Sequence, residues 1–198
     1  PALVRAVGES RADIIALPGA GPADLAELRA AGVMRERPFV SGNPQPGTLG
    51  WVTISRWRLV EVAGSGLTLG RWPELRVAGT GMILRNLHPA PPVTPDASSR
   101  WESALDAIPP AGERMRILAG DFNATLDNRA FRSVLDRGYR DAGDLAGGGL
   151  DWTWSAGRLR RLAIDHVLVP RGVAVERYQV FDLPGSDHNA VSVTLRLP

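Results

Sequence analysis

The chain has 198 residues, 44% of them apolar, and a formal net charge of only +2 at pH 7. This length suits one globular domain with a filled core, and no stretch is long and apolar enough to be a membrane-spanning helix. The lack of cysteine excludes a disulfide framework and a thiolate metal site, and the cellular location stays open. All 23 basic residues are arginine, which binds phosphate with two prongs, although a GC-rich coding genome explains this bias more simply.

Apolar periodicity and turn residues predict helices and strands that alternate along the chain. The helix at 22–31, for example, has Pro22 at its first position and Gly32 just past its end. The other predicted elements are, in order, a helix at 2–9, a strand at 12–17, paired strands at 51–55 and 58–62, strands at 75–77 and 82–87, a helix at about 99–108, a strand at 115–119, a helix at about 128–137, and strands at 152–154, 163–169 and 190–197. With no internal repeat or linker, residues 1–198 are expected to form a single α/β domain.

Polar residues gather where the predicted strands begin or end. Asn86-Leu87-His88, Gly120-Asp121-Phe122-Asn123 and Gly185-Ser186-Asp187-His188 each lie at the boundary of an apolar run, and Asp165 opens the strand between the last two. The ends of strands in open α/β sheets are where ligands collect. Asp and Asn are also common in plain turns, so each cluster taken alone is weak evidence for a site.

Together with Ser55-Arg56-Trp57, these clusters resemble the endonuclease/exonuclease/phosphatase superfamily, the fold of deoxyribonuclease I, exonuclease III, sphingomyelinases and inositol phosphatases. The resemblance runs over essentially the whole chain. It implies an α/β (α+β) four-layer sandwich, in which two mixed β-sheets pack together and are flanked by helices. It also implies hydrolysis of a phosphodiester, a reaction that needs a hard cation and an activated water. Carboxylates and amides suit Mg²⁺ or Mn²⁺ in that role.

The resemblance assigns roles to the acidic and amide residues of these clusters. Asp121 would orient or deprotonate the attacking water, and Asn123 would help to hold the arrangement in place. Asp187, together with Asp121, would be a metal ligand. Asp165 would fix the tautomer of His188, as the orienting acid of a catalytic triad does.

Histidine and arginine side chains would face the phosphate. His188 would act as a cationic group or a general acid or base, and His88 would donate to a nonbridging oxygen with help from Asn86. We expect Arg158, Arg160 and Arg161, which precede the Asp165 strand, to contact the substrate backbone, although a basic loop is more often simply solvated.

The remaining candidates have structural explanations. Strand alternation turns His166 away from Asp165, so we assign His166 to packing. Trp152 and Trp154 share a face and are expected in the core. Asp141 and Asp144 are interpreted as solvated turn residues.

The sequence departs from this family at its start. Relatives begin with a strand that ends in Asn, and their second strand ends in Gln-Glu, whose Glu binds the metal. Here the first predicted element is the helix at 2–9, and Pro18-Gly19 occupy the position of Gln-Glu. We therefore expect weak cation binding and an open sheet edge that another chain could fill.

Two functions consequently stay open: a metal-dependent phosphodiesterase, foremost a nuclease, and a degenerate domain of the same fold that binds phosphoesters or nucleic acid, or serves as a structural module. The sequence does not choose among DNA, RNA, lipid head groups and sugar phosphates as substrate.

Overall fold

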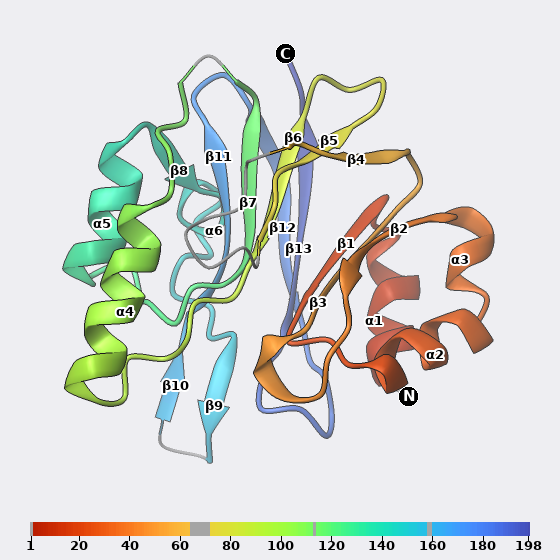
Figure 1. Ribbon diagram of the computed structural model, residues 1–198, viewed down its shortest axis with the longest axis horizontal. Coiled ribbons are helices and arrows are strands. Elements are labelled where there is room, and N and C mark those ends of the chain that lie inside the picture. The colour runs from red at the N-terminus through yellow and green to blue at the C-terminus, as the bar shows by residue number, and fades with distance from the viewer. Residues whose placement is uncertain (1, 64–71, 113, 158–159) are drawn as a thin grey trace.

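The computed structural model describes residues 2–63, 72–112, 114–157 and 160–198 (Figure 1). The elements follow in the order α1 (Ala2–Ser10), β1 (Ile14–Pro18), α2 (Pro22–Ala30), α3 (Val33–Glu36), β2 (Phe39–Asn43), the 3-10 turn η1 (Gly47–Leu49), β3 (Trp51–Ser55), β4 (Leu59–Glu61), β5 (Leu75–Val77), β6 (Ile83–Leu87), α4 (Pro95–Asp106), β7 (Arg116–Asp121), α5 (Arg129–Asp136), β8 (Tyr139–Asp141), α6 (Ala142–Leu145), β9 (Trp154–Ala156), β10 (Arg160–Leu162), β11 (Asp165–Pro170), β12 (Ala174–Phe181) and β13 (Ala190–Arg196). None of the described helices has the length and hydropathy needed to cross a bilayer.

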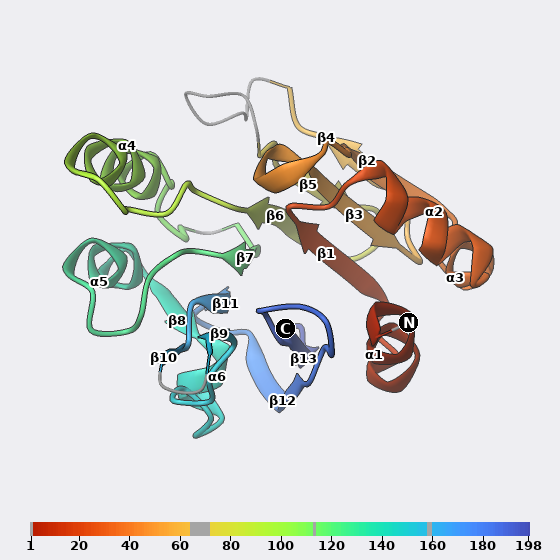
Figure 2. The ribbon, with the colours of Figure 1, turned by 90° about the horizontal axis from the view of Figure 1, so that it is seen from below.

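Two layers of strands face each other, as the family resemblance predicted. One layer is a mixed six-stranded sheet in the order β4-β5-β6-β7-β11-β8, in which β6 and β7 are parallel. The other layer holds the three-stranded sheet β1-β3-β2 and, beside it, the hairpin β12-β13. Figure 2 shows α4 and α5 outside the first layer and α1, α2 and α3 outside the second, so the four-layer sandwich is confirmed.

Apolar side chains fill each interface between the layers. Leu84, Ile117 and Val169 pack between the two strand layers. Trp101 of α4 and Phe131 of α5 pack in the cluster that joins these helices to the six-stranded sheet, and Leu28 of α2 packs with Val52 and Ile54 of β3. Burial of this apolar surface is the main force that holds the layers together.

Local signals set the helix starts. The Thr94 hydroxyl caps α4 by accepting from the amide of Ala97, and Pro95 takes the first helical position, so α4 begins four residues before the predicted 99. Asn128 caps α5 in the same way through the amides of Ala130 and Phe131.

One predicted pairing was wrong. The segments at 51–55 and 58–62 were expected to pair with each other, but β3 lies between β1 and β2 while β4 pairs with β5 in the other sheet. The short chain between β3 and β4 therefore crosses from one layer to the other. Sequence patterns also missed β2, most of whose side chains are exposed, and β12, none of whose side chains is fully buried, because neither strand alternates clearly between buried and exposed residues.

The N-terminal sheet is open on one side. Within the described chain α1 precedes the first strand, and β1 pairs only with β3. The hairpin strand β13 pairs only with β12, and residues of β1 and β13 line opposite sides of one pocket. The expected open edge therefore lies beside β1.

Candidate active site

The parallel pairing of β6 and β7 brings His88 and Asp121 together. Both strands end at the same edge of the sheet, with Leu87 opposite Gly120. A Cβ at position 120 would overlap the carbonyl oxygen of Leu87, and the φ of Gly120 is +143°, so only glycine allows this close approach. The Gly of the Gly-Asp-Phe-Asn motif is thus needed to seat Asp121 beside the end of β6.

The antiparallel strand β11 adds the second carboxylate at the same edge. Asp165, its first residue, lies directly opposite Asp121 in the register of β7 and β11. The fully buried Thr153 fixes this start, because its hydroxyl oxygen accepts from the amides of Ile164 and Asp165 at 3.0 and 2.9 Å. The two carboxyl groups therefore converge because of strand register.

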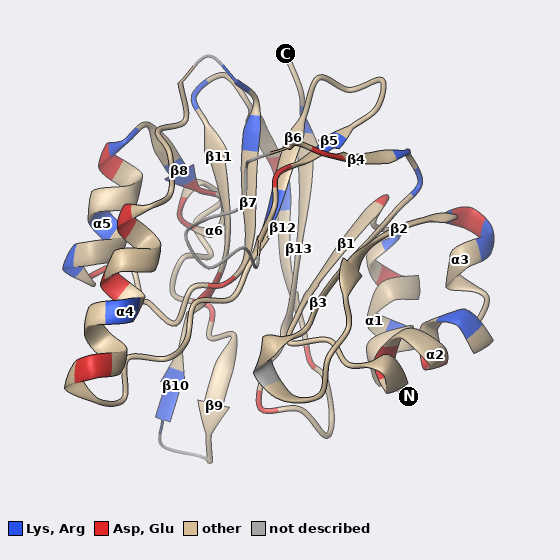
Figure 3. Cartoon of the chain, in the orientation of Figure 1, with Lys and Arg blue, Asp and Glu red and all other residues tan. Residues whose placement is uncertain are grey.

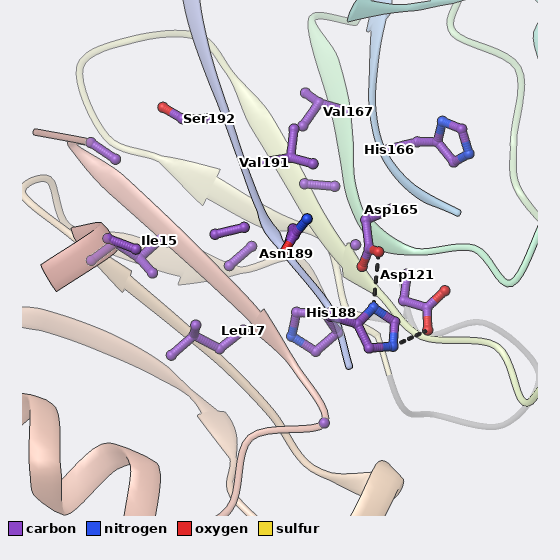
Figure 4. Close-up of a pocket in the computed structure, with 18 of the residues that line it drawn as sticks. Ile15, Leu17, Asp121, Asp165, His166, Val167, His188, Asn189, Val191 and Ser192 are labelled. Carbon is purple, nitrogen blue, oxygen red and sulfur yellow. Dashed lines mark hydrogen bonds and ion pairs between the residues drawn. The ribbon is translucent and has the colours of Figure 1, made fainter. Parts of the chain in front are cut away.

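His188 bridges the two acids from the loop before β13. Its Nδ1 lies 2.9 Å from a carboxylate oxygen of Asp165, and its Nε2 lies 3.9 Å from Asp121 Oδ2 (Figure 4). Burial disfavours the imidazolium, but the hydrogen bond and charge of Asp165, with the charges of Asp121 and Asp187, outweigh it and raise the pKa of His188. Burial also raises the pKa of Asp165, against the opposing hydrogen bond from His188.

Asn123 and His88 complete the surroundings of Asp121. Asp121 accepts from the Asn123 backbone amide at 2.7 Å and from its side-chain amide at 3.3 Å. Asn123 adopts a left-handed conformation, with φ of +50°, and also donates to the carbonyl of Pro89. His88 Nε2 lies 3.4 Å from Asp121 Oδ2. Asp121, which is 4% exposed, is thus held in one orientation from several sides.

A cation could be held at this convergence. Asp121, Asp165 and His188 each offer one donor atom, and these atoms lie within 4.8 Å of one another. Carboxylate oxygens are what Mg²⁺ and Mn²⁺ prefer, and Mg²⁺ usually takes only one or two of them beside its waters. The carboxylates of Asp121 and Asp165 therefore fit a hard divalent ion.

Two predicted residues lie around this centre in different ways. Asp187 lines the same pocket, but its carboxylate accepts from the Trp154 indole at 3.0 Å and is not among the three clustered donors. Asn86 is 2% exposed and is turned into the space between the sheets, where its amide donates to the carbonyl of Val52 at 3.0 Å. The structure therefore brings Asp187 to the pocket and does not bring Asn86 there.

The predicted arginines lie on the neighbouring hairpin. Arg160 and Arg161 are exposed on β10, and the Arg161 guanidinium lies 4.7 Å from the centre of the Trp152 ring. Figure 3 shows this basic strand projecting from the lower edge of the fold. Arg158 lies outside the described residues.

The structure tests the predictions that gave His166, Asp141 and the two tryptophans a purely structural role. His166 is buried and points away from the site, as predicted (Figure 4), and its Nδ1 lies 2.9 Å from Asp141. The prediction for Asp141 was wrong: it is 5% exposed because it pairs with His166 and caps α6. Trp152 and Trp154 are only half-buried, and the buried residue here is Thr153, which lies between them in sequence.

Trp154 and Thr153 are site-supporting residues that sequence reasoning missed. Trp154 forms a β-bridge with His188 and bonds Asp187, so it ties the β9 hairpin to the His188 loop. Thr153 aligns the start of β11. The only signal was their position just before the Asp165 strand, and each partner lies too far along the chain for local patterns to reveal it.

Gly19 lies across the pocket from these acids. It follows β1, and a Cβ there would lie 3.5 and 3.6 Å from the His88 ring atoms Cε1 and Nδ1. Position 19 is therefore beside the site, as the family pattern requires of the metal-binding Glu, but glycine supplies no carboxylate.

Comparisons with known proteins agree with this geometry. The model of the endonuclease/exonuclease/phosphatase family matches residues 2–188, whereas no curated protein sequence matches. An endonuclease/exonuclease/phosphatase structure from Beutenbergia cavernae DSM 12333 is 21% identical with a TM-score of 0.71; the match covers 98% of this chain but only 65% of that one. The 3′ phosphatase NExo from Neisseria, bound to a product DNA hairpin, is 19% identical with a TM-score of 0.73, and the match covers 98% and 93% of the two chains. An AP endonuclease from Archaeoglobus fulgidus is 12% identical with a TM-score of 0.74, and the match covers 98% and 93%.

Proposed function

The chain belongs to the endonuclease/exonuclease/phosphatase family, whose members are hydrolases of phosphoesters that generally depend on a divalent metal, and we propose that it hydrolyses phosphodiesters with Mg²⁺ or Mn²⁺. The observation that carries the proposal is the convergence of Asp121, Asp165 and His188 at one edge of the six-stranded sheet. Structural packing does not require two carboxylates that lie opposite each other with a histidine between them.

The side chains divide the reaction among them. Asp121 is positioned to orient a water and accept its proton, because Asn123 holds the carboxylate still. The hydrogen bond and charge of Asp165 raise the pKa of His188 and so favour its cationic form. Because Asp165 binds Nδ1, the Nε2 beside Asp121 is the nitrogen that can face the developing negative charge on the phosphate. A divalent cation held by Asp121, and by Asp187 from the pocket wall, would neutralise phosphate oxygens.

Nucleic acid is the substrate that we propose. Arg160 and Arg161 project next to the pocket on the β9-β10 hairpin, and arginine contacts phosphates along a backbone. The similar NExo structure holds a DNA product, which supports the same substrate class here.

Gly19 supports a second candidate, a catalytically degenerate domain of the same fold. It lies beside His88 with a φ of +74°, where a side chain is disfavoured, and it supplies no carboxylate. Such a domain would bind nucleic acid or another phosphoester without cleaving it.

Turnover on a panel of substrates tests both candidates. Supercoiled DNA, single-stranded RNA and bis(p-nitrophenyl) phosphate would be incubated with Mg²⁺ or Mn²⁺, with EDTA as control. Cleavage that needs the cation, is lost in Asp121→Asn and persists in Asp136→Asn, a change at an exposed residue of α5, supports the enzyme. Binding of DNA without cleavage of any substrate supports the degenerate domain instead.

A further inference from the structure

Two buried aromatic side chains donate hydrogen bonds to the backbone of the loop 121–124, which follows β7 at the active site. The indole Nε1 of Trp101, in α4, donates to the carbonyl of Phe122 at 2.8 Å. The Nε2 of His166, in β11, lies 2.8 Å from the carbonyl of Ala124, and Nε2 is the donor because a carbonyl only accepts. Trp101 is 3% exposed and His166 is 5% exposed, so both bonds are shielded from water.

The two accepting carbonyls lie on either side of Asn123 in the chain. The backbone of Asn123 is left-handed, with a φ of +50°, and such a conformation persists only where the surrounding structure holds it. In this conformation the backbone amide of Asn123 reaches one carboxylate oxygen of Asp121 at 2.7 Å, and its side-chain amide reaches the other at 3.3 Å. The orientation of the Asp121 carboxylate therefore depends on a backbone conformation that is fixed from both sides.

The imidazole of His166 is itself held in place. Its Nδ1 lies 2.9 Å from Asp141 Oδ2, and Asp141 Oδ1 accepts from the amide of Asp144 at 2.8 Å. The rings of Phe122 and Phe131 pack against the imidazole, with centroids 5.9 and 4.5 Å away. An apolar ring would fill this space without needing polar partners, and buried polar groups are costly unless they are hydrogen-bonded. The bonds at both nitrogens therefore indicate a role for His166 besides packing.

We propose that Trp101 and His166 are positioning residues of the active site, which act by clamping the carbonyls on both sides of Asn123. This inference rests on the proposed hydrolysis of phosphodiesters, in which Asp121 presents its carboxylate to a water. With both donors in place, Asn123 keeps its left-handed conformation and its two bonds to Asp121. Without either donor the loop relaxes, and the carboxylate samples orientations that misplace the water. A misplacement of about 1 Å can lower a rate by about 10²-fold.

Two substitutions of His166 separate positioning from packing. The amide nitrogen of glutamine is as many bonds from Cβ as Nε2 of histidine, whereas the amide nitrogen of asparagine is as many bonds away as Nδ1. His166→Gln can therefore still donate to the carbonyl of Ala124, while His166→Asn reaches only toward Asp141. Hydrogen exchange of the Asn123 backbone amide, followed by NMR, should quicken by about tenfold or more in His166→Asn and stay within about threefold of the parent chain in His166→Gln.

Trp101→Phe tests the other donor, and Tyr139→Phe is its matched control. Tyr139 is a buried residue of the same core cluster, and its hydroxyl donates to the carbonyl of Pro109 at 3.1 Å, outside the loop 121–124. Each change removes one aromatic donor to a backbone carbonyl and keeps an aromatic ring. Only Trp101→Phe should quicken exchange of the Asn123 amide by about tenfold or more, with circular dichroism to check the fold of both variants.

Cleavage of bis(p-nitrophenyl) phosphate at saturating Mn²⁺ links the clamp to catalysis. In His166→Asn and in Trp101→Phe, kcat should fall by about tenfold or more while KM stays within about twofold, because orientation of the water matters only in the transition state. His166→Gln and Tyr139→Phe should keep most of the parent rate. A parent chain that cleaves no substrate would overturn the proposed function, and amide exchange would then decide the clamp by itself.

Three results would overturn the clamp. Equal exchange of the Asn123 amide in His166→Gln and His166→Asn would leave His166 with packing alone. An equal rise in the exchange of the Leu118 amide, in the middle of β7, would mean that the variants lose stability throughout the sheet. Parent-like kcat in a variant with fast Asn123 exchange would separate the loop from catalysis. Should both His166 variants fail to fold, the comparison of Trp101→Phe with Tyr139→Phe decides.

Discussion

The two sides of the pocket differ in how completely the fold holds them. On the side of the six-stranded sheet, Asp121 and Asp165 lie on strands that pair with each other, and Asn123, His88 and His188 surround their carboxylates. On the side of β1, the strand has one neighbour and Gly19 carries no side chain toward His88. The comparison teaches that the six-stranded sheet supplies both the proton-transfer groups and the carboxylates for a cation, whereas the β1 side adds no carboxylate to them.

The largest expected effect is on the cleavage rate, and it comes from a change at the acids of the six-stranded sheet. Asp165→Asn removes the carboxylate that orients His188, so phosphodiester cleavage should fall by about 10²- to 10⁴-fold, the usual contribution of general acid-base catalysis. Asp136→Asn serves as the matched control, and circular dichroism should show that both variants are folded at the assay temperature. Full activity in Asp165→Asn would remove the pair from the mechanism.

The pH dependence of His188 gives a direct check on the same pair. NMR titration should place the pKa of His188 above its usual 6.5, and the value should drop in Asp165→Asn. Because the pKa is raised on folding, the stabilisation is complete below the unfolded pKa and is lost as pH rises through the folded pKa. The stability difference between the parent chain and Asp165→Asn should therefore shrink over that interval. An unchanged pKa in the variant would contradict the pairing.

Thr153→Val tests whether strand register depends on a buried hydroxyl. The change keeps the shape but leaves the amides of Ile164 and Asp165 without their acceptor, so the free energy of unfolding should fall by about 1–3 kcal/mol. Urea denaturation measures this fall. Thr125→Val, at a half-buried residue outside the strands, is the control, and an equal loss there would show that the Thr153 bonds are not special.

Local patterns in the sequence predicted the six-stranded-sheet side of the pocket better than the β1 side. The apolar run before Gly120-Asp121 and the alternation that turns His166 away are local features, so they were visible without a structure. The pairing of His166 with Asp141 and the bond from Trp154 to Asp187 join residues 25 and 33 positions apart, and no local pattern marks them. The pairing of β3 with β1 and β2 was missed for the same reason.

Adding a carboxylate at position 19 should make the β1 side of the pocket resemble the same side in related proteins. Gly19→Glu combined with Pro18→Gln should tighten Mn²⁺ binding, measured by calorimetry, while costing about 1–2 kcal/mol of stability, because position 19 has a φ of +74°. Gly19→Gln with the same second change is the matched control, since it has the same strain without the charge. Tight cation binding by the parent chain would show that another residue already fills this role.

The smallest effect is expected at the link between the β9 hairpin and the His188 loop. Trp154 joins the β9 hairpin to the loop before β13 by donating to Asp187, and both partners are at least partly exposed to solvent, so Trp154→Phe should cost no more than about 1 kcal/mol of stability. The freed Asp187 carboxylate would sample several orientations, and we expect Mn²⁺ affinity to fall by a few-fold while any cleavage rate at saturating Mn²⁺ changes little. Trp152→Phe is the matched control, because the Trp152 ring contacts Arg161 rather than Asp187. Equal losses of affinity in the two variants would mean that the hairpin as a whole supports the site, and that the Trp154 bond does not position Asp187 for a cation.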